Sequence, residues 1–518
     1  MSKRQQIWMV LMLACALGAA RAQDSTTPPA ETPAQNEQPQ EPVAPYGQAN
    51  APPPVGENPP ISGLDLPSLE PNAAPISYLQ PGATVSETAD SNALNAIGGG
   101  SSFSSVTRGL GSLDLKRVWS HYDLSADYVG GAAYYTLEGQ GAKMLQQMDL
   151  DQKINWKRGE LSVRDSFSYL PEGNFGASYG SLGSQGVESL GTTPFSALFG
   201  GAMLGTFGLA PRILNVSLAD VSENLSPKST VTAVGGYAFT HFYGNDVSTG
   251  TPFLGVSQVS GEGGYDRTLS PHTQIAVIYA YQGFDFSVFG LAFHSHVVEG
   301  LYGHRISGRM DFLIGAGPQI TRIDVACGLG DVLSGNSHCS LGSTGVEGTI
   351  PDTRLGVAGQ MHLRYKLPKT LLDLSYQRFE TSGSGFFAGA QSDIARFSAN
   401  RPLNRVWNVF ADIGYARNSR LQSLSAQQQT SCVYANQPNP SNLPLCPGID
   451  ANSYQYGFLG GGVHRHFGHD FNAFATYQFN ELSFDNSYCG TLLVCSRISN
   501  REVITFGLDW TPRPIRLD

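Results

Sequence analysis

Apolar and polar side chains alternate with a period of two along most of the chain after about residue 120. In MDLDQKINW, residues 148–156, apolar and charged side chains fall on opposite faces of an extended strand. The same alternation occurs in LGVAGQMHLRY (355–365), WNVFADIGY (407–415), FNAFATYQFN (471–480) and EVITFGLDW (502–510). Helix-period runs are scarce, and no run of 18 apolar residues follows the N-terminal segment. The pattern predicts many strands and no membrane-spanning helix.

The joins between these strands alternate between short and long. The short joins carry turn residues: KRGE (157–160), SPKS (226–229), SPHT (270–273), SGR (307–309), LPKT (367–370), RPLN (401–404) and FGHD (467–470). The mostly longer joins lie near 137–145, 172–212, 245–255, 289–293, 325–352, 382–393, 420–453 and 485–500. These joins imply about sixteen strands with both termini on the short-turn side. We therefore predict an all-β fold, a closed antiparallel transmembrane β-barrel over residues 116–518.

The tryptophans give an independent indication of the same architecture. Each of the four beyond the N-terminal segment lies at the expected short-turn end of a strand. We expect them to form an aromatic girdle at the periplasmic rim, made of Trp119, Trp156, Trp407 and Trp510.

The N-terminal part of the chain has a different composition. Residues 1–22 combine a basic start, an apolar core and the small-residue site ARA, which predicts a secretory signal peptide. Cys15 lies within this stretch, and the residues before it match a lipidation box poorly. Residues 23–115 are rich in proline and acids, with Arg108 as the one base, so we predict a disordered periplasmic segment. We interpret it as a spacer; contact with the cell wall stays an alternative.

Six of the seven cysteines fall into close pairs within long joins: Cys327 and Cys339, Cys432 and Cys446, Cys489 and Cys495. An even number of cysteines in an exported chain predicts local disulfides that stiffen loops on the oxidising outside of the cell. A zinc site is disfavoured because none of the pairs has the CxxC spacing.

A barrel of this size encloses a water-filled bore. The charged residues that we expect to line it are Asp149, Asp151, Lys153, Arg164, Asp311, His362, Arg364, Asp373, Arg396 and Asp412. Facing rows of acids and bases would create a transverse field, whereas ordinary solvation of the bore would give the same mixture of charges. The join at 172–212 is almost uncharged over PFSALFGGAMLGTFGLAP. We expect it to constrict or plug the bore; a subunit interface or an apolar entrance are alternatives.

These features resemble those of bacterial general porins and related outer-membrane barrel proteins. The resemblance covers residues 116–518 and rests on architecture, without a diagnostic short motif. It implies a Gram-negative outer-membrane channel for passive diffusion of small polar solutes. The chain departs from the pattern in its loop cysteines, its long Pro-rich tail and its end, TPRPIRLD after Trp510, where porins typically end in Phe. These departures weigh more against a porin trimer than against the barrel, and homo-oligomerisation stays open.

The sequence contains no pattern that predicts an enzyme. GxSxG, HExxH, P-loop and dinucleotide-binding glycine patterns do not occur in a fitting context, so we expect no catalytic residue and no cofactor. His294 with His296 and His464 with His466 have spacings that metal ligands can have, but we interpret them as polar rim residues and expect no metal site.

The expected partners are therefore outer-membrane lipid and small polar solutes. The net charge of −10 and the lack of a basic patch argue against nucleic acid. The alternative function is a non-transporting surface protein for adhesion or envelope anchoring, which would use the disulfide-clipped external loops.

Overall fold

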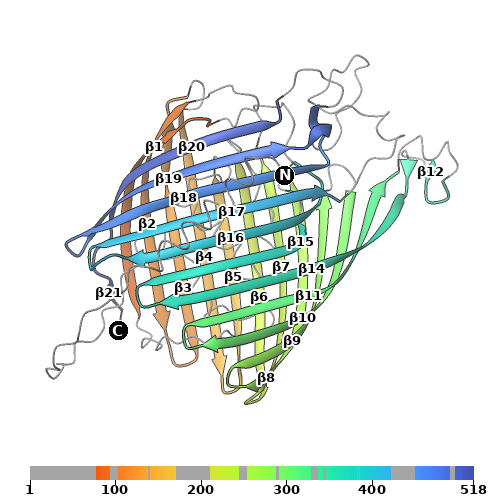
Figure 1. The fold of residues 1–518 in the computed structure, drawn as a ribbon, viewed down its shortest axis with the longest axis horizontal. Helices are drawn as coiled ribbons and strands as arrows, with labels where there is room; N and C mark the ends of the chain where they lie inside the picture. The colour runs from red at the N-terminus through yellow and green to blue at the C-terminus, as the bar shows by residue number, and fades with distance from the viewer. Residues whose placement is uncertain are drawn as a thin grey trace, which may run out of the picture. The chain divides into compact units, whose positions relative to one another are not determined.

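The computed structural model describes residues 77–93, 103–137, 141–170, 211–243, 254–286, 291–327, 336–341, 346–381, 383, 386–421, 450–489 and 496–517. This part of the chain is almost entirely β-strand (Figure 1). No helix within it is long and apolar enough to cross a membrane.

Eighteen long strands form one antiparallel barrel. They are β1 (Tyr78–Asp90), β2 (Ser104–Val118), β3 (Tyr122–Tyr135), β4 (Gly141–Trp156), β5 (Gly159–Leu170), β6 (Arg212–Ser226), β7 (Ser229–Phe242), β8 (Val256–Ser270), β9 (Thr273–Phe286), β10 (Leu291–Ser307), β11 (Met310–Ala326), β14 (Thr349–Leu367), β15 (Thr370–Thr381), β16 (Ala390–Pro402), β17 (Trp407–Arg420), β18 (Ser453–Phe467), β19 (Phe471–Phe484) and β20 (Ile498–Trp510). Short strands β12 (Ser340–Leu341) and β13 (Val346–Glu347) pair with each other, β21 (Ile515–Arg516) pairs with β1, and the 3-10 helix η3 spans Asn486–Cys489.

The barrel closes at the seam between β1 and β20. β1 pairs with β2 on one side, and with β20 on the other from Ala83↔Trp510 to Asp90↔Val503. β21 extends this seam by pairing with Tyr78 and Leu79. The closed sheet leaves no free edge at the seam, which is the condition for a sheet to lie in lipid.

The predicted count of about sixteen strands and the predicted boundary at residue 116 are both wrong. β1 and β2 form one additional hairpin and lie largely within the segment that we predicted to be disordered. Their buried and exposed positions do alternate, but the side chains are mainly small or hydroxylated, so the hydrophobic signal is weak. Residues 1–76, with the predicted signal peptide and the rest of the acidic segment, lie outside the described residues.

The alternation of short and long joins is confirmed. All seven expected turns connect strands at one end of the barrel, which also has a turn between Val118 and Tyr122. The expected long joins connect strands at the opposite end, together with one between Asp90 and Ser104. We call these ends the short-turn rim and the long-loop rim. β1 begins and β20 ends at the short-turn rim.

The two faces of the sheet differ in exposure and in chemistry. Along β19, Asn472 and Gln478 are buried, whereas Phe471 and Tyr477 are more than two-fifths exposed. The exposed face is apolar on strands around the barrel, as shown by Met144, Val163, Val259, Val277, Ile314, Leu355, Tyr415, Ile504 and Phe506. Such a face is suited to hydrocarbon. We call the opposite, buried face the inner face.

β14 continues past its neighbour β15 at the long-loop rim. β14 pairs with β11 as far as Thr349, but with β15 only between Leu367↔Thr370 and Gly359↔Arg378. Among the described residues, the 349–358 part of β14 thus has a strand on one side only. The β15–β16 pairing ends at Thr381↔Ala390, so that hairpin stops short of the end of the β11–β14 pairing at Ala326↔Thr349.

The seam predicts which part of the N-terminal segment is needed for folding. A chain that lacks residues 23–76 should insert into detergent micelles as a heat-modifiable β-barrel, because closure begins at Tyr78. A chain that also lacks residues 77–118 should fail, because β20 then has no partner on one side. Electrophoresis of boiled and unboiled samples, with far-UV circular dichroism, measures both. Equal folding of the two chains would contradict this closure.

Candidate functional site

All ten charged residues that the sequence predicts to line the bore lie on the inner face. Each belongs to the row of its strand that alternates with the exposed apolar row, and each is buried or half-buried. The structure groups them into three clusters. Their role as pore-lining residues stays a prediction.

The first cluster lies on β11, β14 and β15. The Arg364 guanidinium donates from Nη2 to Asp311 Oδ2 over 2.8 Å and from Nε over 3.2 Å. His362 Nε2 lies 2.6 Å from Asp373 Oδ2. Residues that are separated in the sequence meet here because the register places Arg364 opposite both Asp311 and Asp373.

The second cluster is a two-pronged ion pair between neighbouring strands. Arg396 Nε on β16 donates to both carboxylate oxygens of Asp412 on β17, over 2.9 and 3.0 Å, and Nη2 adds a further bond to Oδ2. Both side chains are less than a tenth exposed. This geometry fixes both groups in the wall.

The third cluster lies on β4, β5 and β6. Asp151 is 3.8 Å from Lys153 and 3.9 Å from Arg164, and Arg164 is 3.6 Å from Asp220. Asp149 accepts hydrogen bonds from Ser166 over 2.5 Å and from Gln147 over 2.9 Å. In all three clusters the basic groups lie beside carboxylates of the same or a neighbouring strand. This arrangement favours local neutralisation along the wall over facing rows of opposite charge.

The prediction missed an ion pair across the seam. Arg501 Nε on β20 donates to the two oxygens of Asp90 on β1, over 3.0 and 2.9 Å. The two side chains are 3% and 2% exposed, which makes this the most buried of the ion pairs between described residues. The sequence could not reveal it, because Asp90 falls in the segment that was predicted to be disordered.

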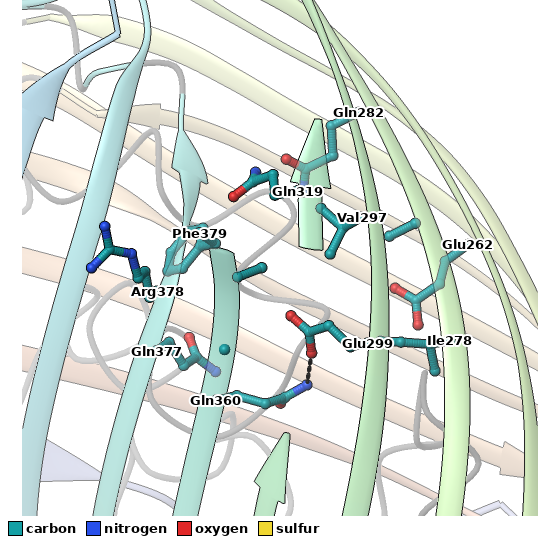
Figure 2. A pocket seen from close by; sticks show the side chains of 13 residues that line it. Glu262, Ile278, Gln282, Val297, Glu299, Gln319, Gln360, Gln377, Arg378 and Phe379 are labelled. Carbon is teal, nitrogen blue, oxygen red and sulfur yellow. Dashed lines mark hydrogen bonds between the residues drawn. The ribbon is translucent and has the colours of Figure 1, made fainter. Parts of the chain in front are cut away.

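A second missed feature is a recess in the inner face over β8, β9, β10, β11, β14 and β15. Figure 2 shows the side chains around it, which include Glu262, Gln282, Glu299, Gln319, Gln360 and Gln377. The period-2 signal is weak here, because several of these strands are apolar or glycine-rich on both faces. The alternation of Gln258, Ser260 and Glu262 is the one sequence signal that could have located it.

An aromatic cluster covers the inner face of β18 and β19 at the long-loop rim. Phe387, in the connection between β15 and β16, lies 5.3 Å from the ring of Tyr454, and Phe386 lies 5.7 Å from the ring of Phe484. Both phenylalanines are almost fully buried, and η3 adds Tyr488 to the cluster. Phe386 and Phe387 therefore point inward over the wall instead of away from the rim.

The same connection also contacts the wall that carries β9 and β10. A side chain at Gly389 would meet the ring of Phe293 at 2.7 Å, so only glycine permits this approach. Leu421, which directly follows β17, packs in one cluster with Phe284 and Phe293. Four strands separate β10 from β17 around the barrel, so these contacts cross its interior. We call residues 386–389 with Leu421 the apolar bridge.

The bridge is made by a different join from the one that we expected to enter the bore. Most of the expected join, 172–212, lies outside the described residues, so its role stays a prediction. For the join at 382–393 the sequence analysis predicts only a long connection between two strands.

The cysteine prediction is confirmed for one pair. Cys327 and Cys339 form a disulfide with 5.7 Å between their Cα atoms. Cys489 is also disulfide-bonded. Cys432, Cys446 and Cys495 lie outside the described residues, so the other two pairings stay predictions.

The histidine pairs have neighbours other than metal ligands. His294 and His296 lie on the exposed face of β10, where Nδ1 of each is 2.9 and 2.8 Å from a tyrosine hydroxyl. His464 is buried on the inner face between the rings of Phe410 and Phe474. Within the described ranges, no group of three or more His, Cys, Asp or Glu side chains could hold a metal ion.

The four tryptophans all lie at the short-turn rim. Trp119 follows β2, Trp156 and Trp510 end β4 and β20, and Trp407 begins β17. Trp119, Trp156 and Trp510 are between two fifths and one half exposed, and Trp407 is half-buried. An arginine side chain lies over the ring of two of them: Arg117 over Trp119 and Arg465 over Trp407. Their function as an aromatic girdle stays a prediction.

No known protein-family model matches the sequence, and no curated protein matches it. Among solved structures, OccAB1 of Acinetobacter baumannii is 8% identical with a TM-score of 0.39, over 84% of this chain and 97% of that chain. OccK5 (OpdH) of Pseudomonas aeruginosa is 11% identical with a TM-score of 0.38, over 85% and 99%. The ferric-catecholate import receptor Fiu of E. coli K12 is 8% identical with a TM-score of 0.39, over 87% and 85%. Similarities this low assign neither a family nor a substrate to this chain.

The seam ion pair predicts a large effect of single substitutions. Arg501→Ala should lower the free energy of unfolding by about 3–5 kcal/mol, because it leaves the Asp90 carboxylate buried without its partner. The double variant D90N/R501Q should lose less. As a control, Arg322→Ala breaks an ion pair whose arginine is 59% exposed, and should cost about 0–1 kcal/mol. Denaturant titration in micelles measures these values; equal losses in R501A and R322A would contradict the account.

The disulfide predicts a local effect. Replacing Cys327 and Cys339 by Ser should leave barrel folding unchanged. The bond joins residues only 12 positions apart in the sequence, and both lie outside the barrel strands. The loss should be roughly 2–3 kcal/mol and confined to the loop. Limited proteolysis should then cut between Ala326 and Thr349 faster than in the parent. Loss of the heat-modifiable form would show that the bond stabilises the barrel itself.

Proposed function

We propose that this protein is an outer-membrane channel through which small polar solutes diffuse passively. One observation supports the proposal most: a closed ladder of strands has an apolar exposed face and an inner face of charged and amide side chains. An apolar face around the whole ladder is suited to lipid, and polar groups on the other face are suited to water. Enzymatic activity is not part of the proposal.

The number of strands supports a bore rather than a packed interior. A barrel of eight strands fills its interior with side chains, whereas barrels of sixteen to eighteen strands leave an aqueous channel. One chain closes this barrel by itself, since β1 and β20 belong to the same molecule. The bore therefore does not require a second copy of the chain.

The apolar bridge would narrow this bore at the long-loop rim. It joins the aromatic cluster of β18 and β19 to the inner face of β9 and β10. An apolar constriction would slow the passage of ions, because it offers few polar groups to replace their hydration shells. Polar solutes would pass through the part of the bore that the bridge leaves open. We infer that the long-loop rim faces the outside of the cell and that the short-turn rim, with its tryptophans, faces the periplasm.

A surface protein for adhesion or anchoring is the second candidate. The observation in its favour is the stiffened connection between β11 and β14, which carries the Cys327–Cys339 disulfide and the small β12–β13 hairpin. In that case the external loops would make the adhesive contacts, and the barrel would only anchor them in the membrane. Planar-bilayer recording separates the two: stable open steps support the channel, and an electrically silent barrel supports the surface role.

The apolar bridge predicts a specific change in conductance. Phe386→Ala combined with Phe387→Ala should raise the single-channel conductance or its fluctuation, because it removes two rings from the bridge. Each substitution should cost about 3 kcal/mol or more of local stability, as for other buried phenylalanines.

Phe397→Ala is the matched control, since that ring is on the exposed face of β16. It should leave the conductance of the parent unchanged. Equal conductance in the bridge variant and the parent, with both folded, would show that the bridge does not limit flow.

A further inference from the structure

The recess over β8 to β15 has a volume of about 60 Å³ (Figure 2). Small residues leave it open: Ala280 and Ala358 line it, and on the inner face of β11 the two positions that precede Gln319 in the alternation are Gly315 and Gly317. A side chain at Gly317 would meet the carbonyl oxygen of Val298 at 1.7 Å. Gln319 is the one β11 side chain among those that line the recess, and the longer polar side chains of the neighbouring strands stand around the same hollow.

Two carboxylates from different strands line the recess. Glu262 on β8 and Glu299 on β10 are each 7% exposed. Glu299 Oε2 accepts a hydrogen bond from Gln360 Nε2 on β14, over 3.0 Å across β11. Glu262 Oε1 is buried and has no hydrogen-bond partner, and the same is true of Gln319 Oε1 and Gln377 Oε1. Each of these free groups is an oxygen that can only accept a hydrogen bond.

No basic side chain neutralises these two carboxylates. The ion pairs between described residues do not include Glu262 or Glu299. Arg378 is the one basic residue among those that line the recess, and its guanidinium points away from it, 3.4 Å from Asp393 (Figure 2). Burying a carboxylate without a counter-charge costs free energy, and a bound cation would remove that cost.

We propose that the recess binds the ammonium or guanidinium group of a solute on its way through the bore. This inference rests on the proposed channel function and adds a solute class to it. Such groups carry N–H donors and a positive charge, which match free carboxylate and amide oxygens, and the resulting bonds are charge-assisted. A solute that offers only a carboxylate or phosphate would be repelled by Glu262 and Glu299.

The size of the recess limits what enters it. A cavity needs roughly 10–15 Å³ to admit one water-sized group, so the recess has room for a head group of a few heavy atoms. The rest of the solute stays in the bore. A calcium ion would need about six to eight oxygen ligands. The recess offers two carboxylates, and within the described residues no group of three or more His, Cys, Asp or Glu side chains could hold a metal ion, so the proposal is made for an organic cation.

The test uses n-propylguanidinium as the probe and the uncharged N-propylurea as its matched control. Binding to the full-length protein in detergent micelles is measured by titration calorimetry, and the effect on single-channel current is measured in planar bilayers. The wild type should bind n-propylguanidinium and show a concentration-dependent reduction of current, whereas N-propylurea should do neither.

Charge-removing variants then locate the site. Glu262→Gln and Glu299→Gln should each weaken binding of n-propylguanidinium about tenfold or more, because each removes a charged acceptor. Glu160→Gln is the control; it removes an acid from the inner face of β5, which does not line the recess, and should bind like the wild type. Heat-modifiable electrophoresis verifies that each variant is folded.

The outcomes separate the recess from the channel. Three results would overturn the recess proposal and leave the channel intact. The first is stable conductance without n-propylguanidinium binding. The others are binding that E262Q and E299Q leave unchanged, and binding that E160Q weakens as much as they do. A silent wild type overturns the channel, and calorimetry still decides the recess. If both recess variants fail to fold, the comparison of the two probes on the wild type decides instead: equal binding of the charged and the uncharged probe overturns the proposal.

Discussion

The structure depends on the hydrogen-bonded seam between β1 and β20. A sheet of this length with one apolar face is tolerated in lipid only if its two edge strands satisfy each other, because lipid offers no partner for backbone N–H and C=O groups. Here the first and last long strands pair over eight positions, and the buried Arg501–Asp90 ion pair lies at one end of that pairing. Every later property, from the apolar exposed face to the enclosed interior, requires this closure.

Closure creates an interior whose chemistry differs from one wall to another. The wall of β4 to β6 and that of β11 to β17 carry ion pairs, in which neighbouring acidic and basic groups neutralise each other's charge. The recess over β8 to β15 overlaps the second of these walls, and its two carboxylates are in none of the ion pairs between described residues. At the long-loop rim the apolar bridge joins two walls through aromatic contacts. A solute that passed through would meet a narrow apolar region and an acidic hollow at different places.

The sequence predicted the barrel because each strand repeats the same signal. In FNAFATYQFN the alternation is strong, and Phe471 and Tyr477 are indeed exposed where Asn472 and Gln478 are buried. β1 and β2 were missed because Ser, Thr and Gly give little hydrophobic contrast, and because the acidic, Pro-rich residues before them dominated the composition of the segment. The presence of prolines before a strand does not exclude the strand itself.

The sequence predicted which face of the sheet the site residues lie on, but not which residues they contact. Alternation placed Arg364 and Asp311 on the inner face, whereas their contact depends on the register between β11 and β14. The recess needs Glu262, Glu299 and Gln360 from three strands, and nothing local in the sequence relates them. The position of Phe386 and Phe387 could not be predicted for the same reason, since it depends on contacts with Tyr454 and Phe484 from two other strands.

Disulfide trapping across the seam tests the central claim most directly. Thr88 on β1 and Thr505 on β20 face each other on the inner face, with their hydroxyl oxygens 3.0 Å apart. Cysteines at both positions should form a bond in the membrane-inserted protein, detected by mass spectrometry of linked peptides. Cysteines at Thr88 and Thr476 should not, because Thr476 pairs with Thr505 on the far side of β20. Efficient linkage of 88 to 505 alone is the predicted result; its absence in folded, membrane-inserted protein would mean that the barrel does not close at β1 and β20.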